Sequence, residues 1–154
     1  RACAVMPMWS HTHAGAFILP YTNILVPIAF DHDRDTDQAL EIARAIRSEG
    51  GKITALHVVE ALPKYATEYL SEAQIAQAHL DIEESLKDAA GRAEDVEVLV
   101  VTGHSGRTIL EQAEKKHADC IVIASHRPGL QDYFLGSTAA RGVRHAQCAV
   151  HVIR

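Results

Sequence analysis

Five short apolar segments rich in valine and isoleucine alternate along the chain with longer segments of helical periodicity. The apolar segments cover residues 23–29, 52–59, 96–101, 120–125 and 149–153. Near-continuous apolar runs of this length are typical of strands that are buried on both faces of a parallel sheet. Because proline cannot donate a hydrogen bond to a neighbouring strand, Pro27 fits the first strand only near its end.

Four helices are predicted between these strands. Capping-box spacing marks the starts of the first two, at Asp35–Gln38 and Ser71–Gln74. Gly50–Gly51 is expected to end the first helix, and the last two helices are predicted over residues 107–116 and 137–145. The alternation predicts an α/β sandwich, in which helices cover both faces of a mostly parallel sheet.

The composition fits one globular domain. The chain has 154 residues, and its hydrophobic content of 47% and charged content of 23% are ordinary for such a domain. No apolar run approaches the roughly 18 residues of a membrane-spanning helix, which excludes an integral membrane protein. The net charge of −5 argues against a general nucleic-acid-binding protein, because such a protein needs a basic surface.

Residues 1–22 show no regular periodicity, and the predicted fold begins at Asn23. We therefore interpret residues 1–22 as an N-terminal extension outside the core fold and residues 23–154 as one domain. The polar stretch Ser10–His13 interrupts the apolar run that a signal peptide would need. Three widely spaced cysteines form neither a disulfide framework nor a zinc motif, and this usage suits the reducing cytoplasm.

The loop after the fourth strand carries the main candidate site, because ligands of open parallel sheets bind beyond the carboxyl ends of the strands. This loop leads from Ser125 to a helix that begins at Gly136, Ser137 and Thr138. Glycine admits close approach to the backbone, and a helix start offers unpaired N–H groups to a phosphate. Arg127 would add a charged contact. The alternative is that Gly136 and Ser137 only cap the helix and that Arg127 is solvated.

A second pair of glycines, Gly103 and Gly106, lies at the end of the third strand. The simpler interpretation is that Ser105 between them is the N-cap of the next helix. The alternative is that the missing side chains admit the sugar of a nucleotide.

Several of these segments occur together in one known family. They are Ile24–Pro27, Leu56–Val59, Ile123–Pro128, Leu135–Ser137 and Val143–Ala146. With them, the chain resembles the universal stress protein family over essentially the whole predicted domain. It is most similar to the small, single-domain bacterial members.

The resemblance implies a Rossmann-like, three-layer sandwich of the adenine nucleotide alpha hydrolase-like type, with strand order 3-2-1-4-5. Many members bind ATP or AMP between the first and fourth strands, and any Mg²⁺ would arrive with the phosphates. Carried over to this chain, the nucleotide-binding positions are Pro27, Ala29, Ile53, Gly103, Ile123, Ser125, His126, Arg127, Gly129, Gly136, Ser137 and Thr138. Among them, Ile53 would face the adenine.

The phosphate motif of the family is Gly, two residues, Gly, nine residues, Gly, and then Ser or Thr. Gly136 and Ser137 match its end. Ala124 and Arg127 occupy the positions of its first two glycines, and the second interval is one residue short. Gly129 is the candidate that supplies the flexibility of the missing second glycine.

A further departure lies after the first strand. Nucleotide-binding members usually have an Asp where this chain has Ala29, which removes one polar contact to the sugar or base. Asp31, two residues further on, is a candidate substitute.

The resemblance implies a nucleotide-binding regulatory protein of the stress response. The alternative is a nucleotide-independent dimeric stress protein that acts through protein–protein contacts. An enzyme is less favoured, since the chain has no P-loop and no catalytic motif of the related synthetases and nucleotidyl transferases. At most, slow ATP hydrolysis or autophosphorylation would be expected.

The last strand, residues 149–153, is expected at an edge of the sheet in the order 3-2-1-4-5. It has no Pro or Lys to block pairing with another chain. We therefore expect a homodimer in which two copies of this strand pair about a two-fold axis. The alternative is a monomer whose edge is shielded by residues 1–22.

Overall fold

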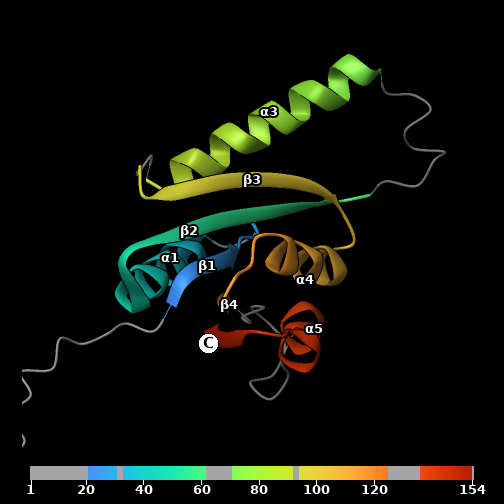
Figure 1. Ribbon diagram of the computed structural model, residues 1–154. Helices are drawn as coiled ribbons and strands as arrows, with labels where there is room; N and C mark the ends of the chain where they lie inside the picture. Colours follow the sequence, from blue (N-terminus) through green and yellow to red (C-terminus); the bar gives the residue numbers. More distant parts are fainter. Residues whose placement is uncertain (1–20, 31–32, 62–70, 92–93, 125–135, 154) are drawn as a thin grey trace, which may run out of the picture.

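The computed structural model describes residues 21–30, 33–61, 71–91, 94–124 and 136–153. Strands and helices alternate along these residues, as the sequence predicts (Figure 1). In chain order they are β1 (Tyr21–Pro27), α1 (Asp33–Ile46), β2 (Arg47–Glu60), α3 (Glu72–Ala89), β3 (Val96–Gly103), α4 (Ser105–Lys115), β4 (Cys120–Ala124), α5 (Ser137–His145) and β5 (Ala149–Ile153). Pro27 is the last residue of β1, the position where a missing N–H group is tolerated.

The strands form one five-stranded parallel sheet in the order β3-β2-β1-β4-β5. This confirms both the predicted α/β class and the strand order that the resemblance implied. The chain leaves β1 toward β2 on one side and later returns to β4 on the other side. The order therefore reverses beside β1, and this is where parallel sheets open a crevice at their carboxyl ends.

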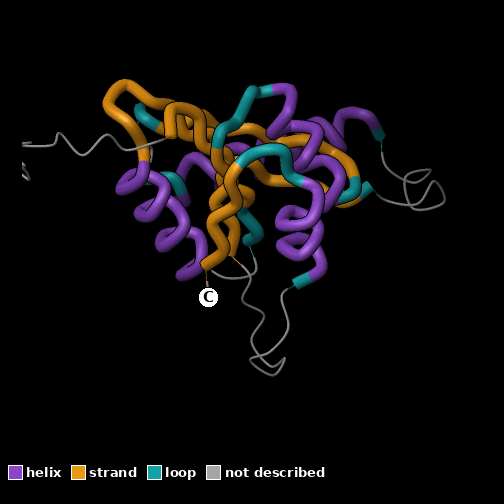
Figure 2. The backbone as a smooth tube through the Cα atoms, turned by 60° about the horizontal axis from the view of Figure 1, so that its bottom comes forward, coloured by secondary structure: helices purple, strands orange, loops and turns teal. Residues whose placement is uncertain are grey.

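Helices cover both faces of the sheet (Figure 2). On one face, Leu40 of α1 and Leu86 of α3 pack with Ile24 in a buried cluster. On the other face, where α4 and α5 lie, Ile109 packs in a second cluster with Leu25. Neighbouring residues of a strand point to opposite faces, so Ile24 and Leu25 supply one cluster each. Burying each such side chain contributes about 1.5–3 kcal/mol, and these clusters fix the positions of the strand ends.

Two predicted boundaries in the first part of the fold are wrong. α1 begins at Asp33, so Asp35 lies in its first turn and is not its N-cap. α1 also ends at Ile46, before the two glycines, and β2 begins at once with Arg47. Gly50 lies instead in an irregularity of the β1–β2 pairing, with a φ of +72° that favours glycine.

The predicted helix caps have different outcomes. The capping box of α3 is confirmed, because the N–H of Gln74 donates to Ser71 Oγ at 3.2 Å and the N–H of Ser71 donates to Gln74 Oε1 at 2.9 Å. The predicted N-cap of α4 is wrong, since Ser105 is the first helical residue and His104 is the N-cap. The side chain of Ser105 bonds to Glu60 instead.

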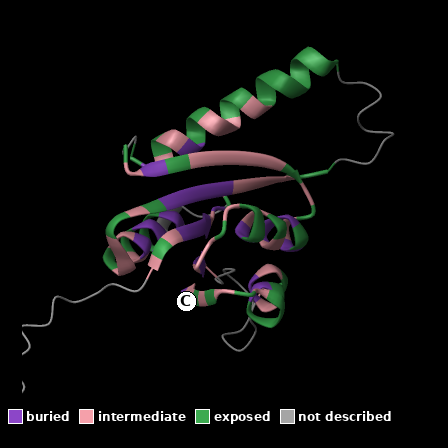
Figure 3. Cartoon of the chain, in the orientation of Figure 1, coloured by how far each residue is buried: buried purple, intermediate pink, exposed green. Residues whose placement is uncertain are grey.

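α3 is anchored by its C-terminal half, and Figure 3 shows its N-terminal half exposed. Leu86 is fully buried, whereas Ile75 and Leu80 are exposed. An open hollow of about 620 Å³ lies between this helix and the edge strand β3. Most of its lining is apolar, including Val98 and Val100 of β3.

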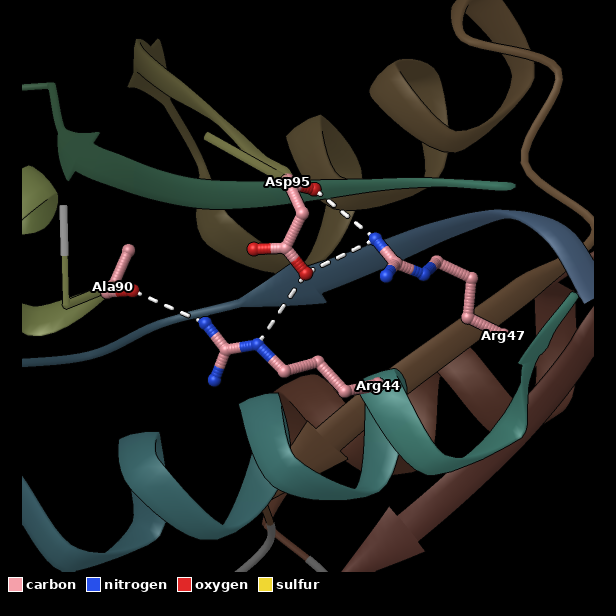
Figure 4. A network of polar contacts seen from close by, with 4 residues as sticks. All are labelled: Arg44, Arg47, Ala90 and Asp95. Atoms are coloured by element: carbon pink, nitrogen blue, oxygen red, sulfur yellow. Dashed lines mark hydrogen bonds and ion pairs between the residues drawn. The ribbon is translucent and has the colours of Figure 1, made fainter. Parts of the chain in front are cut away.

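At the amino end of the sheet, polar side chains bond to one another (Figure 4). Asp95 Oδ2 lies 3.1 Å from Arg47 Nη1 and 3.6 Å from Arg44 Nε. The Arg44 guanidinium also donates to the carbonyl oxygen of Ala90 at 3.2 Å. These contacts join the end of α1 to the connection between α3 and β3.

Asp119, just before β4, forms a second polar cluster at this end. It accepts hydrogen bonds from the Thr22 N–H at 2.7 Å, the Thr22 hydroxyl at 2.8 Å and the Asn23 N–H at 3.0 Å. Partial burial acts to raise the pKa of Asp119, but these hydrogen bonds outweigh it and the pKa is lowered. The Asn23 side chain donates in turn to the Lys116 carbonyl oxygen at the end of α4.

Candidate functional site

A cavity of about 720 Å³ opens at the carboxyl ends of the strands, beside β1 where the strand order reverses. Its lining comes from the chain after β1, the end of β2, the start of α4, the end of β4 and the start of α5. A cavity of this volume can take a ligand of nucleotide size. The hollow beside α3 has a similar volume, but the helix start that it includes, at Glu72, is already capped by Ser71 and Gln74.

The start of α5 faces this cavity with N–H groups that have no partner within the helix. Gly136 is the N-cap, and its carbonyl oxygen accepts the N–H of Ala140 at 2.8 Å. The N–H groups of Ser137, Thr138 and Ala139 precede that first helical bond and have no intrahelical partner. Gly136 has no side chain to cap them, and the first turn of α5 contains no acidic residue. The positive end of the helix dipole therefore points at the cavity, and the first turn of α5 carries no acidic side chain to compensate it.

The start of α4 faces the same cavity but is already neutralised. Glu60, the last residue of β2, accepts hydrogen bonds through Oε1 from the Ser105 hydroxyl and from the Ser105 N–H, the latter at 3.1 Å. These two bonds hold the pKa of Glu60 below its ordinary value, and the bond from the hydroxyl has the larger effect. The protein thus supplies its own anion to this second helix start.

An aromatic pair and apolar side chains form the wall between the two helix starts. The ring centroids of Phe30 and His57 lie 4.5 Å apart at an interplanar angle of 47°. His57 Nδ1 donates to the carbonyl oxygen of Ile28 at 2.9 Å, because a carbonyl can only accept. Val58 and Ile109 complete an apolar wall of the kind on which a planar base can rest.

The structure brings six of the predicted site residues together on this cavity: Pro27, Ala29, Ile123, Gly136, Ser137 and Thr138. Four others lie outside the described residues: Ser125, His126, Arg127 and Gly129. Ala124, which stands at the position of the first glycine of the family motif, also lines the cavity.

The remaining two predicted residues, Ile53 and Gly103, are not among the residues that line this cavity, and their roles stay predictions. Ile53 is fully buried in the middle of the sheet between Ile24 and Val96, and Val58 further along β2 lies on the cavity instead. The absence of a side chain at Gly103 is explained by packing. A Cβ atom there would lie 2.3 Å from the Thr108 hydroxyl oxygen of α4.

The sequence analysis missed Phe30, His57, Glu60, His104 and Ser105, which all line the cavity. His57 and Glu60 lie in the last four residues of β2, Phe30 follows β1, and His104 and Ser105 follow β3. These residues could have been predicted from the rule that ligands bind at the carboxyl ends of parallel strands, because that rule applies to the second and third strands as well as to the fourth.

The part of the chain that the structure describes offers neither a metal site nor a membrane-spanning helix. No group of three or more His, Cys, Asp or Glu side chains there is arranged to hold a metal ion. None of the described helices is both long enough and apolar enough to span a membrane.

Comparisons with known proteins agree with this architecture. The profile of the Universal stress protein family matches residues 20–154. Universal stress protein A homolog 2 of Coxiella burnetii is 29% identical over 140 residues, which are 87% of this chain and 95% of that protein.

Solved structures of similar proteins share the fold. The universal stress protein UspA of Lactobacillus plantarum is 28% identical, with a TM-score of 0.63 over 87% of this chain and 98% of its own. A universal stress protein in complex with cAMP is 22% identical, with a TM-score of 0.61 over 87% and 97%. One from Archaeoglobus fulgidus in complex with dAMP is 20% identical, with a TM-score of 0.58 over 87% and 98%. The fold, its cavity at the reversal of strand order and the match over residues 20–154 lead to one conclusion: the chain belongs to the universal stress protein family.

Proposed function

We propose that the protein is a regulatory protein of the stress response that binds ATP or AMP in the 720 Å³ cavity. The phosphates would lie at the start of α5, against the N–H groups of Ser137 and Thr138, and the base would lie against Phe30 and Val58. Two family members solved in complex with cAMP and with dAMP support an adenine nucleotide as the ligand.

The observation that carries the proposal is the difference between the two helix starts on one cavity. Both α4 and α5 present N–H donors and a positive dipole end. At the start of α4, the N–H and the hydroxyl of Ser105 donate to Glu60, whereas the N-cap of α5 is a glycine and the first turn of α5 contains no acidic residue. A bound anion is therefore favoured at α5 and disfavoured at α4.

Mg²⁺ would be held chiefly by the phosphates and water. Glu60 is the only carboxylate among the described lining residues, and its Oε1 is bonded to Ser105. Ser137 and Thr138 offer hydroxyl oxygens near the proposed phosphates, which suits a cation that keeps most of its water.

Isothermal titration with AMP and with ATP, each with and without Mg²⁺, tests the proposal. We expect binding of both nucleotides, and no binding of adenosine, because the phosphate supplies the contact with α5. Equal binding of AMP and adenosine would contradict the phosphate site. Absence of binding by every nucleotide would favour the alternative, a nucleotide-independent protein that acts through its surfaces.

We further propose a homodimer that pairs through β5. The N–H of Ala149 donates to the Asp119 carbonyl oxygen at 3.2 Å, toward β4. Because backbone N–H groups alternate in direction along a strand, those of Val150 and Val152 point away from the sheet. Such an edge can pair with a second copy.

Val152→Pro tests the dimer without breaking the β4–β5 ladder, since it removes an outward N–H. We expect monomers by light scattering for this variant and dimers for the matched control Val152→Ala, which keeps the N–H. A dimeric Val152→Pro variant would show that the interface lies elsewhere.

We also propose a cytoplasmic location. Cys120 and Cys148, the two cysteines in the described part of the chain, are free thiols. Thiols persist in reducing compartments, and fractionation of cells that express the protein checks this location.

A further inference from the structure

Glu60 is an acidic residue at the carboxyl end of β2, on the wall of the cavity. In doubly wound sheets that bind dinucleotides, an acidic residue that follows the glycine-rich turn by about 20 residues hydrogen-bonds the ribose hydroxyl. In this chain, Glu60 likewise places a carboxylate at the carboxyl end of the second strand, although no glycine-rich turn of that kind precedes it. Its carboxylate stands at the end of β2 and lines the same cavity as Ala29, the position where the resemblance leads us to expect an Asp.

We propose that Glu60 binds the ribose hydroxyls of the nucleotide and so replaces the Asp that is missing at position 29. The inference rests on the proposed function and names the class of ligand. That ligand is a nucleotide with free 2′- and 3′-hydroxyls, in preference to one whose ribose lacks them.

The two strands bring these positions to one edge. Pro27 pairs with Leu56, and the N–H of Ile28 donates to the Leu56 carbonyl oxygen at 2.8 Å. Ala29 follows Pro27 just after β1, and Glu60 follows Leu56 at the end of the neighbouring strand β2. Both residues line the cavity. A carboxylate that is absent from the end of β1 can therefore be supplied from the end of β2.

The carboxylate is positioned before any ligand arrives. Glu60 Oε1 accepts both hydrogen bonds from Ser105, and no described residue donates to Oε2. The bonds from Ser105 keep the pKa of Glu60 low, so the group is an anion and accepts only. Because one oxygen is fixed on α4, little side-chain entropy remains to be lost when the other oxygen binds.

The charge of Glu60 decides which part of the nucleotide it faces. A carboxylate repels phosphate and attracts hydroxyl or amino donors. The phosphates have a separate helix start at Gly136, with no acidic residue in its first turn, and the wall of Phe30 and Val58 suits the base. The two ribose hydroxyls are adjacent donors, and Oε2, the oxygen that Ser105 leaves available, can accept from them; they are the remaining polar part of the ligand.

The experiment measures dissociation constants of AMP, 2′,3′-dideoxyadenosine 5′-monophosphate and inosine 5′-monophosphate by isothermal titration. We expect the wild-type protein to bind AMP about 10-fold more tightly than the dideoxy analogue, as for hydrogen bonds to a charged group. Glu60→Ala should bind the two equally. The matched control Glu114→Ala, an exposed carboxylate on α4, should keep the 10-fold preference.

Two further variants separate recognition from structure. Ser105→Ala keeps the carboxylate and should keep a preference for AMP. Ala29→Asp combined with Glu60→Ala returns an acid to the end of β1 and should restore part of the preference. Equal thermal unfolding of all variants checks that each one is folded.

Three outcomes would overturn the role of Glu60 while leaving nucleotide binding intact. The first is that the wild-type protein binds AMP and the dideoxy analogue equally, and the second is that Glu60→Ala keeps the wild-type preference for AMP over the dideoxy analogue. The third is that Glu60→Ala changes only the preference for AMP over inosine 5′-monophosphate. The last would assign the carboxylate to the base amino group. If the wild-type protein binds no nucleotide at all, the proposed function itself fails.

Discussion

The amino and carboxyl ends of this sheet carry similar polar groups, but these groups have different partners. At the amino end, Asp119 is bonded to Thr22 and Asn23, and Asp95 is paired with two arginines. At the carboxyl end, the start of α5 and Glu60 line a cavity, and no described residue donates to Glu60 Oε2.

This difference assigns stability to one end and binding to the other. A polar group that has a partner within the fold stabilises it when formed and costs free energy when the partner is lost. A polar group directed into a cavity contributes little to folding but is available to a ligand without rearrangement. Substitutions at the two ends should therefore affect different measurements.

Gly136→Val should have the largest effect, and it should act on binding alone. The branched side chain would keep a phosphate from the N–H groups of α5. Loss of one or two charged hydrogen bonds, about 3 kcal/mol in total, corresponds to about a 100-fold weaker affinity for ATP. Titration measures this loss, and urea unfolding should give a free energy within about 0.5 kcal/mol of wild type. Unchanged affinity would remove the phosphate site from α5.

Asp119→Ala should be the reverse case, with an effect on stability and not on binding. The substitution leaves the N–H groups of Thr22 and Asn23 without their acceptor. We expect a loss of about 2 kcal/mol in the free energy of unfolding, as for hydrogen bonds to a partly exposed charged group. Urea unfolding checks this value, with Glu114→Ala as the exposed control on α4. A tenfold weaker nucleotide affinity in this variant would show that the two ends are coupled.

The contribution of Asp119 should also depend on pH. Its pKa is lowered in the folded protein, so its stabilisation is fully present above the unfolded-state value of about 4 and is lost as the pH falls through the lower folded-state value. We therefore expect the difference in unfolding free energy between wild type and Asp119→Asn to shrink as the pH falls from neutral to below about 4. A constant difference across this range would mean that the charge of Asp119 is not what stabilises the amino end.

The strands were predictable from the sequence, whereas the contacts at both ends of the sheet were not. The valine- and isoleucine-rich runs locate β3, β4 and β5 closely, because a strand buried on both faces needs apolar side chains throughout. The glycine pair at Gly50 misled the prediction, since a positive φ serves an irregular strand as well as a helix end. The sequence also did not show which residues of β2 reach the cavity, because that depends on how β2 pairs with β1.

Long-range partners were also beyond the sequence pattern. Glu60 and Ser105 are 45 residues apart, and neither residue type specifies the other. Ser105 looked like a helix cap because serine usually is one. Its role changes because β2 extends to Glu60 and brings a carboxylate to the start of α4.

Asp95→Ala should have the smallest effect on stability of these substitutions, although Asp95 also lies at the amino end of the sheet. Asp95 contacts both Arg44 and Arg47, but its side chain is one-third exposed, so water screens the pairs. We expect a loss below about 1 kcal/mol in unfolding free energy, reduced further by high salt, and no change in nucleotide affinity. Urea unfolding at low and high salt measures it, with the exposed neighbouring substitution Glu94→Ala as the control. A salt-independent loss of about 2 kcal/mol or more would show that Arg44 and Arg47 bind this carboxylate as firmly as Thr22 and Asn23 bind Asp119.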